Sequence, residues 1–231
     1  MPRSWSLRLP RFTAQAMRRM FTLGLAAAFL GLFAKITLKF VREGESSLLT
    51  IDTAIMNWIA EHRTSWLNMA ATDLTALGSS SVVTLLSIVG LILLLLTRDR
   101  IDALQLVIAA IGSGVWTNLL KRGFERSRPT ILPRLVEATG YSYPSGHALT
   151  SAAMYLTLAL IACRYVRSTH KQSIVIALSV MVVAIVALTR VYLGVHYPSD
   201  ITSGVLFGWA WALILGSGFS YIGRRLNGNG R

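Results

Sequence analysis

The sequence contains few charged residues and almost no cysteine. Only 14% of its 231 residues are Asp, Glu, Lys or Arg, whereas a soluble domain has about 25%. With 53% hydrophobic residues, the chain is neither disordered nor collagen-like. A disulfide scaffold is excluded because the single cysteine, Cys163, has no partner within the chain. This composition is typical of an integral membrane protein.

Acidic residues are the scarcest charged type. The chain has 10 of them against 23 Lys and Arg, which gives a net charge of +13. In a membrane protein, such an excess can orient the chain, hold anionic lipid or bind an anionic substrate. The basic residues are scattered between apolar runs and form no stripe, so we expect membrane lipids and not nucleic acid as partners.

Long apolar runs predict an all-α fold: a polytopic membrane protein with six transmembrane helices in one bundle, plus an interfacial amphipathic helix. A spanning helix needs roughly 20 apolar residues. The predicted spans are Met20–Phe40, Ser80–Leu96, Ile101–Leu120, His147–Tyr165, Ser173–Leu193 and Ile201–Ile222. The predicted membrane domain covers residues 20–223, between a basic segment at residues 1–19 and a tail at residues 224–231.

The amphipathic helix is predicted at Leu48–Trp66. Ile51, Ile55 and Trp58 recur at helical spacing, and Asp52 falls elsewhere on the helical wheel. Such a helix either lies at the membrane interface, with its tryptophans at headgroup level, or packs under the bundle. The sequence leaves both arrangements open.

Basic residues predict that both termini lie on the cytoplasmic side of a cytoplasmic (inner) membrane. Span counting places most of them on one side: Arg3, Arg8, Arg11, Arg18, Arg19, Arg98, Arg100, Arg164, Arg167, Lys171, Arg224 and Arg225. The loops at residues 121–146 and 195–200 then face the outer, periplasmic side. A cleaved signal peptide is the alternative for the first span, but its apolar run is long, and no small-residue cleavage site precedes a soluble domain.

The first of these outer loops contains a cluster of cations. Lys121, Arg122, Arg126 and Arg128 lie within nine residues, together with the acidic Glu125. The positive-inside tendency disfavours such a cluster on the outer side. An anionic substrate accounts for it, and so does an anionic lipid headgroup.

The same loop ends in Pro144-Ser145-Gly146-His147, directly before the fourth span. Gly146 permits a backbone turn, and Ser145 stands at the position of a helix cap. The free N–H groups of that helix would form an anion site, with His147 in its first turn. An ordinary helix cap with an interfacial histidine is the alternative.

The second outer loop follows the pattern Arg190-x5-His196-x3-Asp200. Arg190 ends an apolar helix, where a charge without a partner is costly. Asp200 can accept a hydrogen bond from one nitrogen of His196, fix its tautomer, and leave the other nitrogen as a base or nucleophile. Taken alone, the pair is equally compatible with a structural hydrogen bond.

These three segments fall on one side of the membrane by span counting. They supply three cations, two histidines, one carboxylate and a helix N-terminus. Phosphoryl transfer needs cations on the phosphate oxygens, an in-line nucleophile and an acid for the leaving oxygen. Their combination indicates an enzyme that acts on phosphate groups.

The ordered motifs Lys-x6-Arg-Pro, Pro-Ser-Gly-His and Arg-x5-His-x3-Asp, between Lys121 and Asp200, resemble the three signature motifs of the type 2 phosphatidic acid phosphatase (PAP2) family. These lipid phosphate phosphatases include bacterial members that resemble this chain in size and six-helix layout. One departure is Thr189, which stands where the family commonly has a serine before the arginine.

The resemblance implies the roles of the site residues. His196 would be the nucleophile that forms a phosphohistidine, with Asp200 raising its basicity. His147 would protonate the departing lipid oxygen and later help to activate water. The phosphate would be held by Lys121, Arg128, Arg190, Ser145 and Gly146. No metal or other cofactor is implied, and the outer loops show no cluster of carboxylates or closely spaced histidines.

The resemblance also implies the reaction class. The expected reaction removes a phosphomonoester or terminal diphosphate from a membrane lipid, with undecaprenyl diphosphate, phosphatidylglycerophosphate and phosphatidic acid as candidate substrates. A lipid-to-lipid phosphotransferase of the same family is one alternative. A non-enzymatic transporter or binding protein for lipid phosphates is another, although charges confined to helix ends argue against a conduction path.

Overall fold

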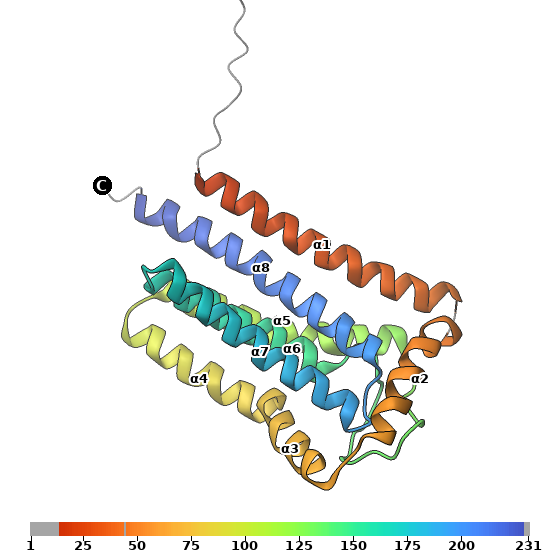
Figure 1. Cartoon of the computed structure of the whole chain (residues 1–231). Coiled ribbons are helices and arrows are strands. Elements are labelled where there is room, and N and C mark those ends of the chain that lie inside the picture. Colours follow the sequence, from red (N-terminus) through yellow and green to blue (C-terminus); the bar gives the residue numbers. More distant parts are fainter. Residues whose placement is uncertain (1–13, 44, 229–231) are drawn as a thin grey trace, which may run out of the picture.

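The computed structural model describes residues 14–43 and 45–228, and this part of the chain is all-helical (Figure 1). The elements are α1 (Ala14–Glu43), α2 (Glu45–Glu61), α3 (Ser65–Thr75), the 3-10 turn η1 (Ala76–Gly78), α4 (Ser80–Leu96), α5 (Arg100–Phe124), α6 (Gly146–Tyr165), α7 (Thr169–Tyr192) and α8 (Pro198–Gly228).

The predicted polytopic all-α membrane fold is confirmed. Five described helices (α1, α5, α6, α7 and α8) are long and apolar enough to cross a membrane. The sixth predicted span, α4, has 17 residues. It qualifies as a span together with α3 and η1, from which it is bent by 43°.

The first and last helices of the chain, α1 and α8, extend beyond the predicted spans. Helix α1 begins at Ala14 instead of Met20, and α8 continues to Gly228 instead of ending at Ile222. The reason is that residues with basic side chains can stay in the helix at the membrane surface while their charged groups reach water. Of the predicted inner-side cations, Arg3, Arg8 and Arg11 lie outside the described residues.

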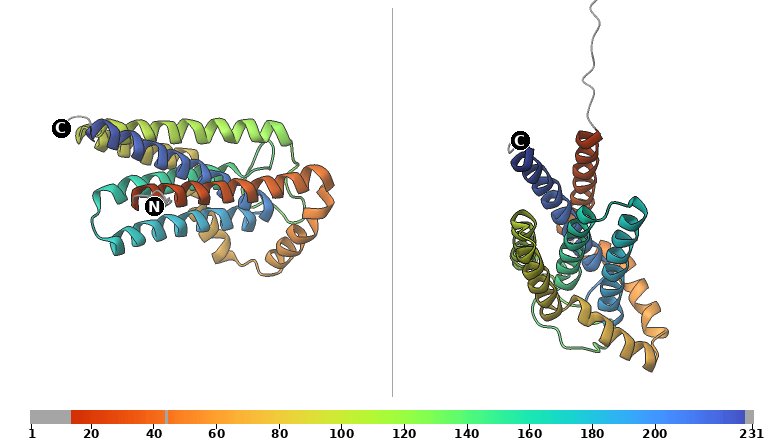
Figure 2. Two further views of the ribbon diagram at one scale, coloured as in Figure 1. Left: turned by 90° about the horizontal axis from the view of Figure 1, so that it is seen from above. Right: turned by 90° about the vertical axis from the view of Figure 1, so that its left-hand side faces the viewer.

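The two ends of the bundle carry different connections (Figures 1 and 2). At one end lie α2, α3, the long loop between α5 and α6, and the short α7–α8 turn; we call this the loop end. At the other end, α1 begins and α8 finishes, next to the α4–α5 and α6–α7 turns; we call this the terminal end.

Helices α6 and α8 pack tightly against each other and determine how the loop end is assembled. A Cβ atom on Gly208 would lie 2.4 Å from the carbonyl oxygen of Leu149, and one on Gly204 would lie 2.8 Å from that of Ser145. Glycine is therefore required at both positions, as is common where membrane helices approach closely. This contact brings the start of α6 next to the start of α8.

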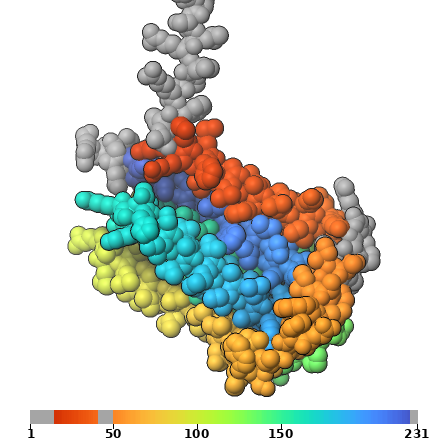
Figure 3. Space-filling model, viewed as in Figure 1, coloured from red at the N-terminus to blue at the C-terminus, as the bar shows by residue number. Residues whose placement is uncertain are grey.

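The predicted single helix at Leu48–Trp66 is wrong in its continuity, because the chain turns between α2 and α3 (Figure 1). Both helices lie at the surface of the loop end (Figure 3). Arg63 fixes the turn by donating hydrogen bonds to the carbonyl oxygens of Pro133, at 2.8 Å, and Tyr192. Packing against the bundle is seen for one face of α2, on which Asp52 and Met56 are buried. Another face, with Trp58, is exposed.

Candidate active site

One cavity at the loop end brings the predicted site residues together. It has a volume of about 450 Å³ and lies among α5, α6, α7 and the two loops. The predicted residues that line it are Lys121, Arg128, Gly146, His147, Arg190 and His196. The remaining two, Ser145 and Asp200, are fully buried.

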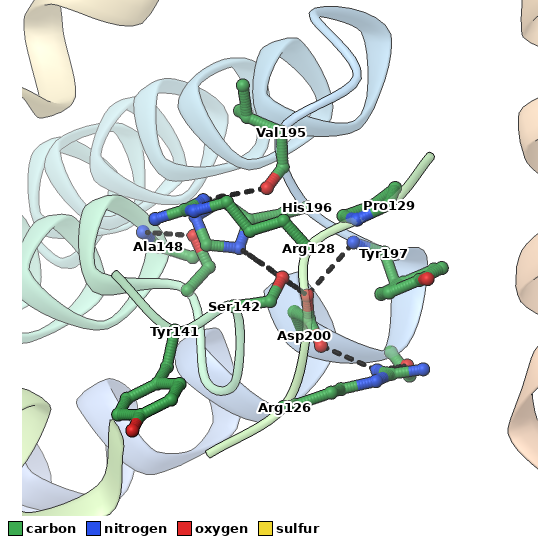
Figure 4. A network of polar contacts seen from close by, with 12 residues as sticks. Arg126, Arg128, Pro129, Tyr141, Ser142, Ala148, Val195, His196, Tyr197 and Asp200 are labelled. Carbon is green, nitrogen blue, oxygen red and sulfur yellow. Dashed lines mark hydrogen bonds and ion pairs between the residues drawn. The ribbon is translucent and has the colours of Figure 1, made fainter. Parts of the chain in front are cut away.

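His196 and Asp200 form a buried pair in the turn before α8 (Figure 4). Nδ1 of His196 lies 3.4 Å from Oδ2 of Asp200. The hydroxyl of Ser142 lies 3.3 Å from the same nitrogen and donates to Oδ2 at 2.5 Å. On the other side of the ring, Nε2 lies 3.4 Å from Nη1 of Arg128. The carboxylate therefore faces one ring nitrogen, and a cation that lines the cavity faces the other.

The surroundings of His196 keep its ring neutral. Burial lowers the pKa of His196 to about 4; Arg128 and Lys121 act in the same direction, and Asp200 opposes them. At neutral pH the ring therefore carries one proton. With that proton on Nδ1, directed at Asp200, Nε2 keeps its lone pair on the side of Arg128 and can act as a nucleophile.

Arg126 is a central residue of the site that the motif spacing did not single out. Its Nη1 donates to Oδ1 of Asp200 at 2.6 Å and to the Ser199 hydroxyl at 2.7 Å, and its Nη2 donates to Oδ2 of Asp52 at 3.0 Å. Burial acts to lower the pKa of Arg126, but Asp200 and Asp52 raise it above its usual value. Arg126 thus anchors the carboxylate that faces His196.

Asp52 was also missed, although the sequence contained part of the signal. It lies on the buried face of α2 together with Met56, away from the exposed Trp58, and it is 2% exposed. Its carboxylate accepts hydrogen bonds from the Ser199 backbone N–H, at 2.9 Å, and from Arg126. An acid on an amphipathic helix is usually solvated; here it is a structural partner of the site.

Backbone carbonyl groups hold Arg128 in place. Its guanidinium donates to the carbonyl oxygens of Thr139 at 2.8 Å, Gly140 at 3.0 Å and Val195 at 2.8 Å. These bonds connect the long loop to the turn that carries His196. The side chain is therefore fixed beside Nε2 of His196 without any ligand.

The other two predicted phosphate-binding cations keep unused hydrogen-bond donors. Lys121 donates to the carbonyl oxygen of Tyr141. Arg190, which is 6% exposed, donates to the Thr75 hydroxyl at 3.0 Å, and its Nε has no hydrogen-bond partner among the described residues. Within the described chain, neither of these cations nor Arg128 forms an ion pair. With Arg122, four basic residues line the cavity against one acid, Glu137, and this surplus of positive charge favours an anionic ligand.

The predicted helix cap before α6 is confirmed. The Ser145 hydroxyl accepts a hydrogen bond from the backbone N–H of Ala148 at 3.5 Å, and the Ser145 N–H donates to the carbonyl oxygen of Asp200 at 3.1 Å. Gly146 and His147 form the first turn at the cavity wall. The positive end of the helix dipole therefore contributes to the cavity.

These features define a class of protein. Preorganised donors around the cavity stabilise the charge of a phosphoryl group in transfer, and the neutral His196 beside them can attack it. Among the described residues, no group of three or more His, Cys, Asp or Glu side chains could hold a metal ion. The fold and the site are those of a multi-pass membrane enzyme that acts on phosphate groups.

Comparison with known proteins identifies the family. Residues 102–224 match the PAP2 superfamily. The chain is 31% identical over 165 residues to phosphatidylglycerophosphatase B of Bacillus subtilis (strain 168), a match that covers 71% of this chain and 80% of that protein. The chain therefore belongs to the PAP2 superfamily, and it is a metal-independent lipid phosphate phosphatase of the membrane.

Two further relatives support this assignment. A lipid A 1-phosphatase of Rhizobium etli is 31% identical over 164 residues, which cover 61% of this chain and 66% of that protein. The crystal structure of a transmembrane PAP2 type phosphatidylglycerolphosphate phosphatase from Bacillus subtilis superimposes with a TM-score of 0.77 at 25% identity. It covers 85% of this chain and 96% of the other.

Proposed function

We propose that the chain hydrolyses the terminal phosphate of a membrane lipid through a phosphohistidine on His196. Nε2 of His196 attacks phosphorus while protonated His147 gives its proton to the departing lipid oxygen. Neutral His147 then takes a proton from a water molecule that attacks the phosphohistidine. Free His196, inorganic phosphate and the dephosphorylated lipid result.

The observation that carries this proposal is the position of Nε2 of His196 in a cavity lined by unpaired cations. Lys121, Arg128 and Arg190 would hold the phosphate oxygens, and the backbone N–H of Gly146 would add a donor. Ser145 contributes by fixing the start of α6. Asp200 orients His196 and stabilises the positive charge that develops on the ring during attack.

Among candidate substrates, the relatives favour phosphatidylglycerophosphate, which two of them act on by name. Lipid A 1-phosphate, undecaprenyl diphosphate and phosphatidic acid offer the same terminal phosphate group. The test is phosphate release by the purified protein in mixed micelles with each lipid in turn. Fastest release from phosphatidylglycerophosphate is expected. If no lipid releases free phosphate but a labelled phosphate appears on an acceptor lipid, the chain is a phosphotransferase.

We also propose that the loop end faces the outer, periplasmic side of a cytoplasmic (inner) membrane, with both termini in the cytoplasm. The surplus of cations at the terminal end supports this orientation. In a Cys163→Ser background, a cysteine introduced at the exposed Glu137 of the loop end should react with an impermeant thiol reagent in intact cells. One at the exposed Arg98 of the terminal end should not. The reverse labelling pattern would show that the proposed topology is inverted.

A further inference from the structure

A second cavity lies at the terminal end, at the opposite end of the bundle from His196. It has a volume of about 330 Å³ and is bordered by α1, α6, α7 and α8. Four arginines line it, and the other lining residues are uncharged. The lining consists of Gln15, Arg18, Arg19, Thr22, Leu160, Cys163, Arg164, Gln172, Gly216, Ser217, Ser220 and Arg224.

Only one of these arginines has a carboxylate partner within the described chain. Arg164 forms an ion pair with Asp102 and donates to the amide oxygen of Gln105 at 2.6 Å and to the carbonyl oxygen of Gly216 at 3.3 Å. These bonds make Arg164 a rigid part of the wall. Asp102 does not line the cavity, and neither does any other acidic residue.

Several other polar groups of the wall have unused donors. Arg18 and Arg224 are exposed, and their guanidinium groups make no hydrogen bond or ion pair with another described residue. Arg19 stacks over the Tyr221 ring at 4.3 Å, and its buried Nε lacks a hydrogen-bond partner in the same part of the chain. The hydroxyl of Ser217, a residue that is 8% exposed, is equally unpartnered there. Buried donors usually have acceptors, so these groups indicate a ligand that accepts hydrogen bonds.

Membrane orientation alone does not explain this arrangement. Cations on the cytoplasmic side act through their number in the short loops, wherever their side chains point. Arg167 and Lys171 lie at the same end, and neither lines the cavity. Four arginines on three different helices line one cavity. An anionic ligand would account for this convergence, which membrane orientation does not.

We propose that this cavity binds the phosphate group of an anionic phospholipid from the adjoining leaflet. Arginine matches the geometry of phosphate oxygens, and basic pockets between membrane helices hold anionic headgroups. The hydrocarbon chains would lie along α1. On that helix, Met17, Met20 and Phe21 are 61%, 58% and 74% exposed beside the two arginines. The site is separate from the loop end and takes part in no step of the reaction proposed there.

The experiment uses Cys163, the single cysteine of the chain, as a reporter in the cavity wall. Its rate of modification by N-ethylmaleimide is measured in zwitterionic micelles with increasing phosphatidylglycerol, which has no terminal phosphate to lose. Phosphatidylcholine and glycerol phosphate are the comparison ligands. Phosphatidylglycerol should slow the modification in a saturable way, and the other two should not.

The test variant is Arg18→Gln with Arg224→Gln, because these side chains make no hydrogen bond or ion pair with another described residue that a glutamine would break. Each arginine near an anionic headgroup contributes about fivefold in affinity, so half-maximal protection should require roughly 30-fold more phosphatidylglycerol. Arg167→Gln with Lys171→Gln removes two charges from the same end but outside the cavity. In this variant phosphatidylglycerol should protect Cys163 as well as it does in the unchanged protein. Both variants feel the same surface potential of the micelle.

Two outcomes would overturn the proposal. If both double variants shift the protection curve equally, the arginines act only through general surface charge. If glycerol phosphate protects as well as phosphatidylglycerol, the cavity takes a free phosphate and not a lipid. Phosphate release from phosphatidylglycerophosphate, measured for each variant in a separate assay, reports on the loop end, so loss of catalysis and loss of lipid binding remain distinguishable.

Discussion

Arginines gather at both ends of the bundle, but the two groups have different surroundings. At the loop end, Arg126 is 1% exposed and bonded to two carboxylates, and three carbonyl oxygens hold Arg128. At the terminal end, Arg18 and Arg224 are exposed and have no partner among the described residues. The contrast teaches that arginines held by carboxylate or carbonyl groups form a rigid reaction site, whereas arginines without such partners remain open to bind a ligand.

The loop end further divides its cations between two tasks. Arg126 uses both terminal nitrogens on Asp52, Asp200 and Ser199 and does not line the cavity. Arg128 lines the cavity, together with Lys121. A site of this kind is preorganised, so little reorganisation is needed when charge develops on the phosphoryl group.

The largest expected effect is the loss of turnover when either of the two histidines at the loop end is replaced. The two variants should lose activity in different ways. His196→Ala removes the nucleophile, so turnover of lipid phosphate should fall to background. His147→Ala keeps the nucleophile but removes the group that protonates the leaving oxygen and later activates water; the acid usually contributes about 10²–10⁴-fold. An aryl phosphate needs this acid less, so His147→Ala should regain part of its first-step rate, the formation of the phosphohistidine, on such a substrate. Equal recovery in both variants would show that the roles are wrongly assigned.

The next largest effect is on the free energy of unfolding, when one ion pair at each end is removed. Arg126→Met leaves two buried carboxylates without their partner, and breaking a buried pair typically costs about 3–5 kcal/mol. Arg164→Met removes a pair whose side chains are 24% and 12% exposed, so water can replace the lost contact and the cost should be smaller. The free energy of unfolding in detergent would measure both. Equal losses would contradict the contrast between the two ends.

Much of this comparison could be predicted from the sequence. Hydrophobic runs located the spans because each must cover the hydrocarbon thickness, and the prediction for α4, Ser80–Leu96, coincides with the observed helix. Motif spacing located His147, His196 and the cations because these residues sit at helix ends that meet on one side. Thus the fold and the cavity-lining residues followed from local pattern.

The missed features all depend on long-range contacts. Asp52 and Arg126 are 74 positions apart, and no periodicity relates an acid on an amphipathic helix to one particular arginine of a cluster. Ser142 has no motif of its own and gains its place from the fold of the long loop. The break between α2 and α3 likewise depends on Arg63 reaching the carbonyl groups of distant loops.

The smallest effect concerns pH and sharpens the assignment to the loop end. The pKa of His196 is lowered to about 4, so the folded protein favours the neutral ring. This contribution to stability is complete above the ordinary value near 6.5 and declines as the pH falls toward 4. The acid limb of kcat/KM, corrected for ionisation of the substrate phosphate, should therefore lie near pH 4. Arg18→Gln with Arg224→Gln should leave it unchanged, and a limb near 6.5 would contradict the account.

The most direct test of the central claim is to trap the covalent intermediate. The protein is mixed with a lipid carrying a labelled terminal phosphate and quenched in alkali, because acid destroys a phosphohistidine. The account predicts alkali-stable label on the unchanged protein and on His147→Ala, and none on His196→Ala. Label that persists on His196→Ala would contradict it.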